Sequence, residues 1–327
     1  MRARTRVGRP DRGSTTPGGA RPGTDAHGNN AGCTIFTRAS WSHRRRMNLR
    51  RRSGIGFWLL GMAVAPASAE AFDFAVVGTT FTYTDAQRSF SGMILIPPGA
   101  GPFPAIVFDH GQGGTPTGYP NAQVMLGWGA VVIAPTLTHV TGGDFSPAGS
   151  GNSPENLARG LAVVDALASL DYVDDDRIAL FGHSKGAYAA IGQVSALGAR
   201  VRVAAMSAGG VVPDSAGVGQ AAPTYGEAIS VVAPFLMFHG NIDGAVPPQR
   251  SVDFAAQLAL RGIAHERVEY DVSALDPNQQ HNLHQTPAIN ADMLARTHAW
   301  FSAWGLFGVG DALFVDGFEI QGTGGAR

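Results

Sequence analysis

A serine between two glycines is the residue of this chain best placed to act as a nucleophile. The pentapeptide Gly-His-Ser-Lys-Gly at 182–186 follows an apolar run at 177–181 and precedes a small-residue, helix-like stretch at 187–194. A serine hydroxyl is a poor nucleophile by itself, so a sharp strand-to-helix turn must present it to a base and to backbone N–H donors. The glycines leave room for close packing, and we expect Ser184 to adopt a strained backbone conformation. The pattern predicts a nucleophile elbow.

A second glycine-rich turn can stabilise negative charge that develops on a substrate. The apolar, strand-like segment 103–109 runs into His-Gly-Gln-Gly-Gly at 110–114. Such a turn can direct the backbone N–H of Gln112 at an oxyanion. The N–H of Lys185, the residue after the serine, is the second expected donor.

Two further segments supply candidates for an acid and a base. The buried-strand pattern at 234–238 ends in a loop that carries Asp243, and the strand-like segment 265–270 leads to a loop with His281 and His284. A serine nucleophile needs a histidine to accept its proton and a carboxylate to orient that histidine. By position alone, either His281 or His284 can be the base.

These motifs carry a family resemblance. From about Phe72 to Trp304 the chain resembles the dienelactone hydrolase-like branch of the α/β-hydrolases, through its His-Gly-x-Gly-Gly, Gly-His-Ser-x-Gly and His-Gly-x-x-Asp-x-x-Val-Pro segments. The resemblance implies a mostly parallel central sheet, a Ser-His-Asp triad and hydrolysis of esters or related acyl compounds.

The resemblance also assigns roles to individual residues. It implies that Ser184 is the nucleophile and Asp243 the acid. It favours His281 as the base because the family pattern places an apolar residue two positions later, where this chain has Leu283. His284 stays the alternative base. The chain departs from the family in having serine where the dienelactone hydrolases proper usually have cysteine, and in the sequence of 275–280 before the histidines.

Strand-like and helix-like segments alternate along the chain, which predicts an α/β fold with a parallel sheet covered by helices on both faces. The expected strands lie at 72–83, 89–96, 104–109, 130–134, 177–181, 201–207, 234–239 and 265–271. The expected helices lie at 119–128, 154–169, 185–196, 248–261 and 286–303. The first two strands are expected to form an antiparallel edge hairpin. The Gly-, Pro- and Ala-rich segment 209–230 is either a small lid or a long loop.

The segments outside 70–304 are not expected to belong to this domain. Residues 1–46 have too little apolar periodicity to fold, and we interpret them as a disordered or non-native extension. Residues 47–69 combine a basic start, an apolar core and Ala-Ser-Ala, which predicts a signal peptide cleaved before Glu70 and a secreted or periplasmic protein. The tail, 305–327, either resembles a C-terminal motif of exported proteins or forms a final strand or a disordered end.

Charge and composition exclude several kinds of partner. The whole chain has a net charge of −1, but from Glu70 onward 11 Lys and Arg face 23 Asp and Glu, which leaves −12. An acidic protein without clustered positive charge is not expected to bind nucleic acid or an anionic membrane. The apolar run in 47–69 is too short to span a bilayer comfortably.

Cofactor signals are also missing from the sequence. It has no phosphate-binding loop and no persuasive dinucleotide fingerprint, and the two histidines lack further ligands at a spacing that suits a metal. The only cysteine, Cys33, precedes the predicted cleavage site. We therefore expect no cofactor, metal or disulfide.

The sequence thus predicts a secreted serine hydrolase that cleaves carboxylic esters, small or polymeric, through an acyl-enzyme. A peptidase or a polyester or lipid hydrolase of the same fold is an alternative, because the loops determine the substrate. A non-catalytic binding protein of this fold is the alternative from another class. The oligomeric state is not predicted.

Overall fold

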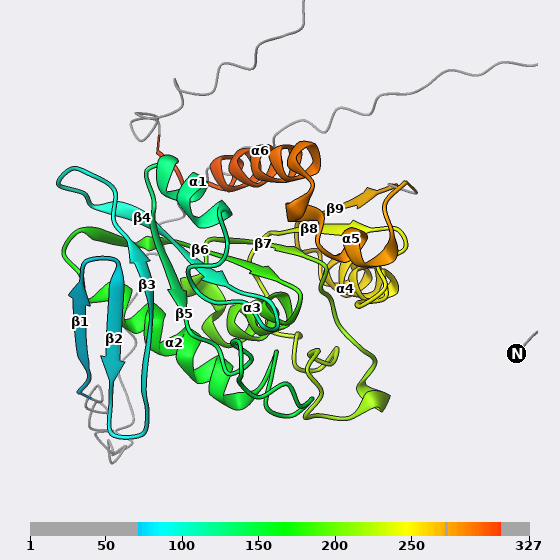
Figure 1. Cartoon of the computed structure of the whole chain (residues 1–327), viewed down its shortest axis with the longest axis horizontal. Helices are drawn as coiled ribbons and strands as arrows, with labels where there is room; N and C mark the ends of the chain where they lie inside the picture. Colours follow the sequence, from blue (N-terminus) through cyan, green and yellow to red (C-terminus); the bar gives the residue numbers. More distant parts are fainter. Residues whose placement is uncertain (1–70, 272–273, 309–327) are drawn as a thin grey trace, which may run out of the picture. The chain divides into compact units, whose positions relative to one another are not determined.

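The computed structural model describes residues 71–271 and 274–308, which contain a nine-stranded sheet with helices on both sides (Figure 1). The strands are β1 (Asp73–Val77), β2 (Thr80–Thr84), β3 (Ser89–Leu95), β4 (Phe103–Asp109), β5 (Val131–Pro135), β6 (Val173–His183), β7 (Val203–Ser207), β8 (Phe235–Gly240) and β9 (His265–Tyr270). The helices are α1 (Asn121–Gly127), α2 (Pro154–Ala168), α3 (Lys185–Leu197), α4 (Gln249–Leu260), α5 (Pro277–His281) and α6 (Pro287–Ala303).

The sheet is mostly parallel, as the sequence predicts. Its strand order is β1-β2-β3-β5-β4-β6-β7-β8-β9. The strands from β5 to β9 pair in parallel, whereas β1, β2 and β3 form an antiparallel edge that joins the rest through β3 and β5. The carboxyl ends of β4, β6, β8 and β9 therefore lie along the same edge.

Helices cover both faces of the sheet, which confirms the predicted layers. Helices α2, α3 and α4 pack on one face and α1 and α6 on the other (Figure 1). Side chains of β4 alternate between the two layers: Ala105 and Val107 join the first core, and Ile106 and Phe108 join the second. Strands buried on both faces have no polar side to expose, which is why β4, β5, β7 and β8 are almost unbroken apolar runs.

The first strand expected from the sequence, 72–83, is wrong in its extent. The chain turns at Gly78 and Thr79, and Val77 pairs with Thr80, so this segment forms the β1–β2 hairpin. Gly78 has a φ of +61°, and two-residue hairpin loops require a positive φ at such a position. The edge is a three-stranded antiparallel meander rather than one hairpin.

The segment before the two histidines, expected as a loop, contains the short helix α5. The Asp276 carboxylate accepts hydrogen bonds from the N–H groups of Asn278 and Gln279, and the Gln279 side chain accepts one from the Asp276 N–H. Pro277 occupies the first helical position. This capping box is a helix-start signal that can be recognised in the sequence. It starts α5 at Pro277, and the helix ends at His281.

The segment 209–230 has no α-helix of its own. It contains a single 3₁₀ turn at Asp214–Ala216 and an isolated bridge between Val212 and Thr224. The segment is thus a loop with little regular structure. Its residue Ala221 reaches the candidate site.

Close packing at the β6–α3 turn depends on glycine. A Cβ on Gly186 would lie 2.1 Å from the backbone oxygen of Asp109, and a Cβ on Gly182 would lie 2.4 Å from the backbone oxygen of Gly186. Backbone atoms in a sheet cannot swing aside as the end of a side chain can. Between these glycines Ser184 has a φ of +56° and a ψ of −121°. This confirms the strained conformation predicted for it.

We predict that Gly186→Ala destabilises the fold by about 1–3 kcal/mol, because the new methyl group meets the backbone of β4. In an open helical position, the same change would instead stabilise by up to about 1 kcal/mol. Gly127→Ala is the matched control, since a Cβ there meets nothing within 4 Å. Urea unfolding of the two variants measures the difference. Equal stability of the two would contradict the packing argument.

Candidate active site

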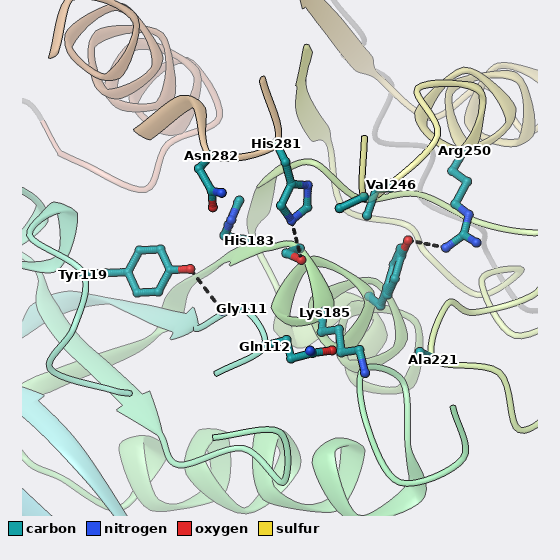
Figure 2. A pocket seen from close by; sticks show the side chains of 13 residues that line it. Gly111, Gln112, Tyr119, His183, Lys185, Ala221, Val246, Arg250, His281 and Asn282 are labelled. Atoms are coloured by element: carbon teal, nitrogen blue, oxygen red, sulfur yellow. Dashed lines mark hydrogen bonds between the residues drawn. The ribbon is translucent and has the colours of Figure 1, made fainter. Parts of the chain in front are cut away.

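The predicted site residues come together where the parallel strands end. Gln112 follows β4, Ser184 follows β6, Asp243 follows β8, and His281 lies at the end of α5, beyond β9. Ligand sites of open α/β sheets lie at this edge. Ser184, His281, Gln112 and Lys185 line one cavity of about 410 Å³ (Figure 2).

A chain of hydrogen bonds connects the serine, the histidine and the aspartate. The Ser184 hydroxyl donates to His281 Nε2 at 2.9 Å, the bond drawn as a dashed line in Figure 2. His281 Nδ1 lies 2.9 Å from Asp243 Oδ2 and 3.0 Å from Oδ1. A carboxylate only accepts, so Nδ1 carries the proton and Nε2 is left free to accept one. This is the tautomer that a general base for the serine needs.

The environment of Asp243 keeps its carboxylate ionised. Burial by itself raises the pKa of Asp243, but hydrogen bonds from His239, His281 and the Val246 N–H outweigh burial and hold the pKa well below its usual range. The N–H groups of Ala245 and Val246 each donate to Oδ1 at 2.8 Å. The negative charge that would stabilise an imidazolium is thus present at any working pH.

The His239 imidazole also contacts the Asp243 carboxylate. The sequence motif alone does not reveal this contact. His239 Nε2 lies 3.3 Å from Asp243 Oδ2 and 3.0 Å from the Val246 oxygen, while its Nδ1 lies 2.9 Å from Ser251 Oγ. Both partners of Nε2 are acceptors, so this nitrogen carries a proton. The spacing of four residues between His239 and Asp243 is the sequence signal that could have pointed to the contact.

The two N–H groups predicted to hold an oxyanion are free to do so. Within residues 71–271 and 274–308, neither the Gln112 N–H nor the Lys185 N–H donates a hydrogen bond to a protein acceptor. Both residues line the cavity beside Ser184. Unpaired backbone donors at a cavity are what a developing oxyanion requires.

The His110 side chain fixes the peptide that carries the Gln112 N–H. His110 Nε2 accepts from the Leu137 N–H at 3.1 Å, so the ring proton is on Nδ1, which donates to the Gly111 oxygen at 2.9 Å. The Gly114 N–H donates to the same oxygen. The Gly111 C=O and the Gln112 N–H belong to the same peptide group, and in a trans peptide they point in opposite directions. The hydrogen bonds to the Gly111 oxygen therefore leave the Gln112 N–H pointing away from these contacts.

The alternative base, His284, does not contact the serine hydroxyl. Its ring centroid lies 4.6 Å from that of His183 and 4.9 Å from that of Tyr119, and its buried Nδ1 has no hydrogen-bond partner in the part of the chain that the structure describes. Burial lowers the pKa of His284 to about 4, so the ring is neutral at neutral pH. Of the two candidates, the structure brings only His281 to Ser184.

Sequence reasoning missed several residues of the cavity wall. Tyr119, Tyr188, Arg250 and Asn282 line it together with the predicted residues. Tyr188 and Asn282 lie beside the predicted motifs, and Tyr119 and Arg250 lie outside them, but no pattern marks any of the four as a wall residue. The Tyr119 hydroxyl, for instance, accepts a hydrogen bond from the Gly111 N–H at 3.3 Å, a contact that depends on how two loops fold together.

The described residues contain neither a metal-ligand cluster nor a membrane-spanning helix. No group of three or more His, Cys, Asp or Glu there could hold a metal ion. No helix in residues 71–271 and 274–308 is long and apolar enough to span a bilayer. The predicted extension at 1–46, the signal peptide at 47–69 and residues 309–327 of the tail lie outside the described residues.

Comparisons with known proteins identify the fold. No protein-family model and no curated protein matches the sequence. Among solved structures, the acylaminoacyl peptidase of Pyrococcus horikoshii matches with a TM-score of 0.57 at 15% identity, over 71% of this chain and 42% of the peptidase. This chain therefore spans less than half the length of that peptidase.

Two smaller proteins match over nearly their whole length. A thermophilic esterase from the planctomycete Thermogutta terrifontis, solved with propionate bound, has a TM-score of 0.53 at 16% identity, over 68% of this chain and 92% of the esterase. A putative dienelactone hydrolase from Klebsiella pneumoniae has a TM-score of 0.50 at 18% identity, over 66% and 94%. With the sheet order described above, these likenesses show that the chain has the α/β-hydrolase fold.

A buried carboxyl group lies beneath the elbow. Asp109 ends β4 and is fully buried, and neither of its oxygens makes a hydrogen bond of normal geometry with the described residues. Burial raises the pKa of Asp109 to about 8, against a smaller opposing effect of the Gln193 side chain. At neutral pH the folded protein therefore holds a proton that the unfolded chain releases above about pH 4.

We predict that this proton makes the fold less stable as pH rises from about 4 to about 8, by roughly 1 kcal/mol per pH unit. The sign follows because the folded-state pKa exceeds the unfolded one, so the unfolded chain binds fewer protons in this range. Asp109→Asn, which cannot ionise, should remove most of the slope. Asp175→Asn, at an exposed position, is the control. Urea unfolding at pH 5 to 8 measures the slopes, and an unchanged slope in Asp109→Asn would contradict the argument.

Proposed function

We propose that the protein is a serine hydrolase that cleaves carboxylic esters through a covalent acyl-enzyme. The observation that carries the proposal is the unbroken contact from Ser184 through His281 to Asp243, beside two unpaired backbone N–H groups. A protein that only binds has no need to keep a nucleophile, a base, an acid and free oxyanion donors in contact. The proposed catalytic roles follow from this arrangement.

In the first half-reaction Ser184 Oγ attacks the ester carbonyl carbon while its proton passes to His281 Nε2. Asp243 stabilises the imidazolium, and the N–H groups of Gln112 and Lys185 hold the oxyanion. Collapse of the tetrahedral intermediate breaks the bond to the alcohol, which leaves with the proton from Nε2. Water then attacks the acyl-enzyme by the same route, releasing the acid and restoring the Ser184 hydroxyl.

An ester is favoured over a peptide because of how the chain compares with its neighbours. It covers 92% of the esterase but 42% of the peptidase, so it corresponds to nearly all of the first and to only part of the second. The same triad geometry can cleave an amide, and hydrolysis of peptides remains the second candidate. Rates on an ester and an anilide of the same acyl group separate the two.

We further propose that the enzyme acts outside the cytoplasm. The basic and apolar pattern of 47–69 supports this, because it has the order of a signal peptide. The acidic balance of the residues that follow suits a small-molecule or polymeric ester rather than a polyanionic partner.

We predict that Ser184→Ala lowers kcat on p-nitrophenyl butyrate by about 10³- to 10⁶-fold, leaving only what binding and the oxyanion hole provide. His281→Ala should cost a similar factor, because among the described residues Nε2 is the only side-chain acceptor of the serine proton. Near-wild-type turnover by folded Ser184→Ala would show that this serine is not the nucleophile.

The matched control is His284→Ala, which removes an imidazole three residues away that does not touch the serine. We expect its kcat to stay within about tenfold of wild type, since its contacts are with aromatic rings. Steady-state kinetics of the two histidine variants decides between the bases. A loss in His284→Ala equal to that in His281→Ala, with the fold intact by circular dichroism, would overturn the assignment.

A further inference from the structure

Some of the positively charged side chains of the domain form ion pairs with carboxylates, and others do not. The described residues include 10 Lys and Arg. Six form ion pairs with carboxylates, namely Arg88, Arg159, Arg177, Arg200, Arg267 and Arg296. The other four, Lys185, Arg202, Arg250 and Arg261, have no carboxylate within ion-pair distance among residues 71–271 and 274–308. In an acidic protein such exceptions need a reason.

For two of these four, the reason is structural. Arg202 donates to the backbone oxygen of Trp304 at 2.9 Å. Arg261 donates to three backbone oxygens of the 228–231 turn. Both guanidinium groups thus donate hydrogen bonds to backbone carbonyl oxygens. Neither residue lines the cavity. Lys185 and Arg250, in contrast, both line the cavity that holds the nucleophile.

Lys185 and Arg250 also line an adjoining cavity of about 370 Å³. Ala221 is the third residue shared by the two cavities. Figure 2 shows Lys185, Ala221 and Arg250 on one side of the pocket, with Tyr119 and Asn282 on the other. A substrate that extends from Ser184 into the second cavity must pass both cations. No carboxylate lines either cavity within the described residues.

Both charged groups are fixed in place and still have free donors. Lys185 Nζ donates to the Phe145 oxygen at 2.8 Å and to Ser150 Oγ at 2.7 Å. Arg250 donates to the Tyr188 hydroxyl, and its guanidinium lies 5.5 Å from the centre of that ring. An ammonium has three N–H donors and a guanidinium five. Among the described residues, one donor of Lys185 and four of Arg250 therefore have no hydrogen-bond acceptor.

Two ordered cations with unused donors are complementary to an anion, and a neutral ester gains little from them. Arg and Lys form their strongest hydrogen bonds with carboxylate or phosphate oxygens. Such a pair, fixed before the substrate arrives, avoids much of the entropic cost of binding. Where the two cavities meet, the wall thus favours negative charge.

We propose that Lys185 and Arg250 form an anion subsite, and that the enzyme selects esters whose chain ends in an anionic group reaching into the adjoining cavity. The inference rests on the proposed ester hydrolysis and specifies its substrate class. The anion is bound by Arg250 and Lys185 while the ester carbonyl lies at Ser184. These side chains act on specificity rather than on the bond-breaking steps.

The test compares two esters of matched shape, mono-p-nitrophenyl adipate and p-nitrophenyl 6-methylheptanoate. The first ends in a carboxylate and the second in an isopropyl group. For wild type we expect kcat/KM to be at least about tenfold higher on the adipate, and the ratio to fall with added NaCl as charges are screened. Arg250→Gln, which keeps a donor for Tyr188, should lower the ratio by about tenfold, mainly through KM.

Two further variants isolate the charge. Arg250→Lys keeps the cation and should retain most of the preference, which a merely structural role of Arg250 would not explain. Arg202→Gln removes the same charge far from both cavities and should leave the ratio unchanged. An equal fall of the ratio in Arg202→Gln and Arg250→Gln would overturn the subsite.

The outcomes for wild type separate this inference from the function on which it rests. Hydrolysis of both esters with equal kcat/KM would overturn the anion subsite and leave the esterase standing. Failure to hydrolyse either ester, or any other p-nitrophenyl ester, would overturn the proposed function and the subsite with it. A preference for the adipate that Arg250→Gln abolishes supports both.

Discussion

The contact between His281 Nε2 and Ser184 Oγ, at 2.9 Å, is the interaction on which the rest of the site depends. Two residues separated by 97 positions meet there, so their distance is set by the sheet and not by local sequence. Parallel pairing brings the carboxyl ends of β4, β6, β8 and β9 to one edge. A shift of one residue in that register would move the loops that follow and part the two side chains.

Much of the buried structure can be understood as support for this contact. Glycines at 182 and 186 let the elbow press against β4, which holds Ser184 in a conformation that a looser turn would not impose. The capping box of α5 fixes the start of the short helix that carries His281. His239 holds the Asp243 carboxylate from a second direction, and His110 orients the peptide of Gln112. Each of these features restricts the movement of a site residue and so keeps the groups that transfer the proton in a defined geometry.

The sequence predicted those parts of the site that local rules govern. An elbow, a glycine turn and a strand-end aspartate each depend on short segments, and Ser184, Gln112 and Asp243 lie where their motifs place them. His281 could not be separated from His284 by position alone, because the choice depends on how α5 packs against β8. The break at Gly78 was missed since one glycine in a strand-like run signals a turn only weakly. Arg250 carries no motif, and its place beside Lys185 arises only when α3 and α4 come together.

The most direct test of a serine activated by His281 is covalent labelling with a fluorophosphonate, followed by intact-mass analysis and peptide mapping. The reagent reacts with a serine whose proton a base can accept. We predict one adduct per chain, on Ser184, and its loss in His281→Ala. No adduct on the folded protein, or an adduct on another residue, would contradict it.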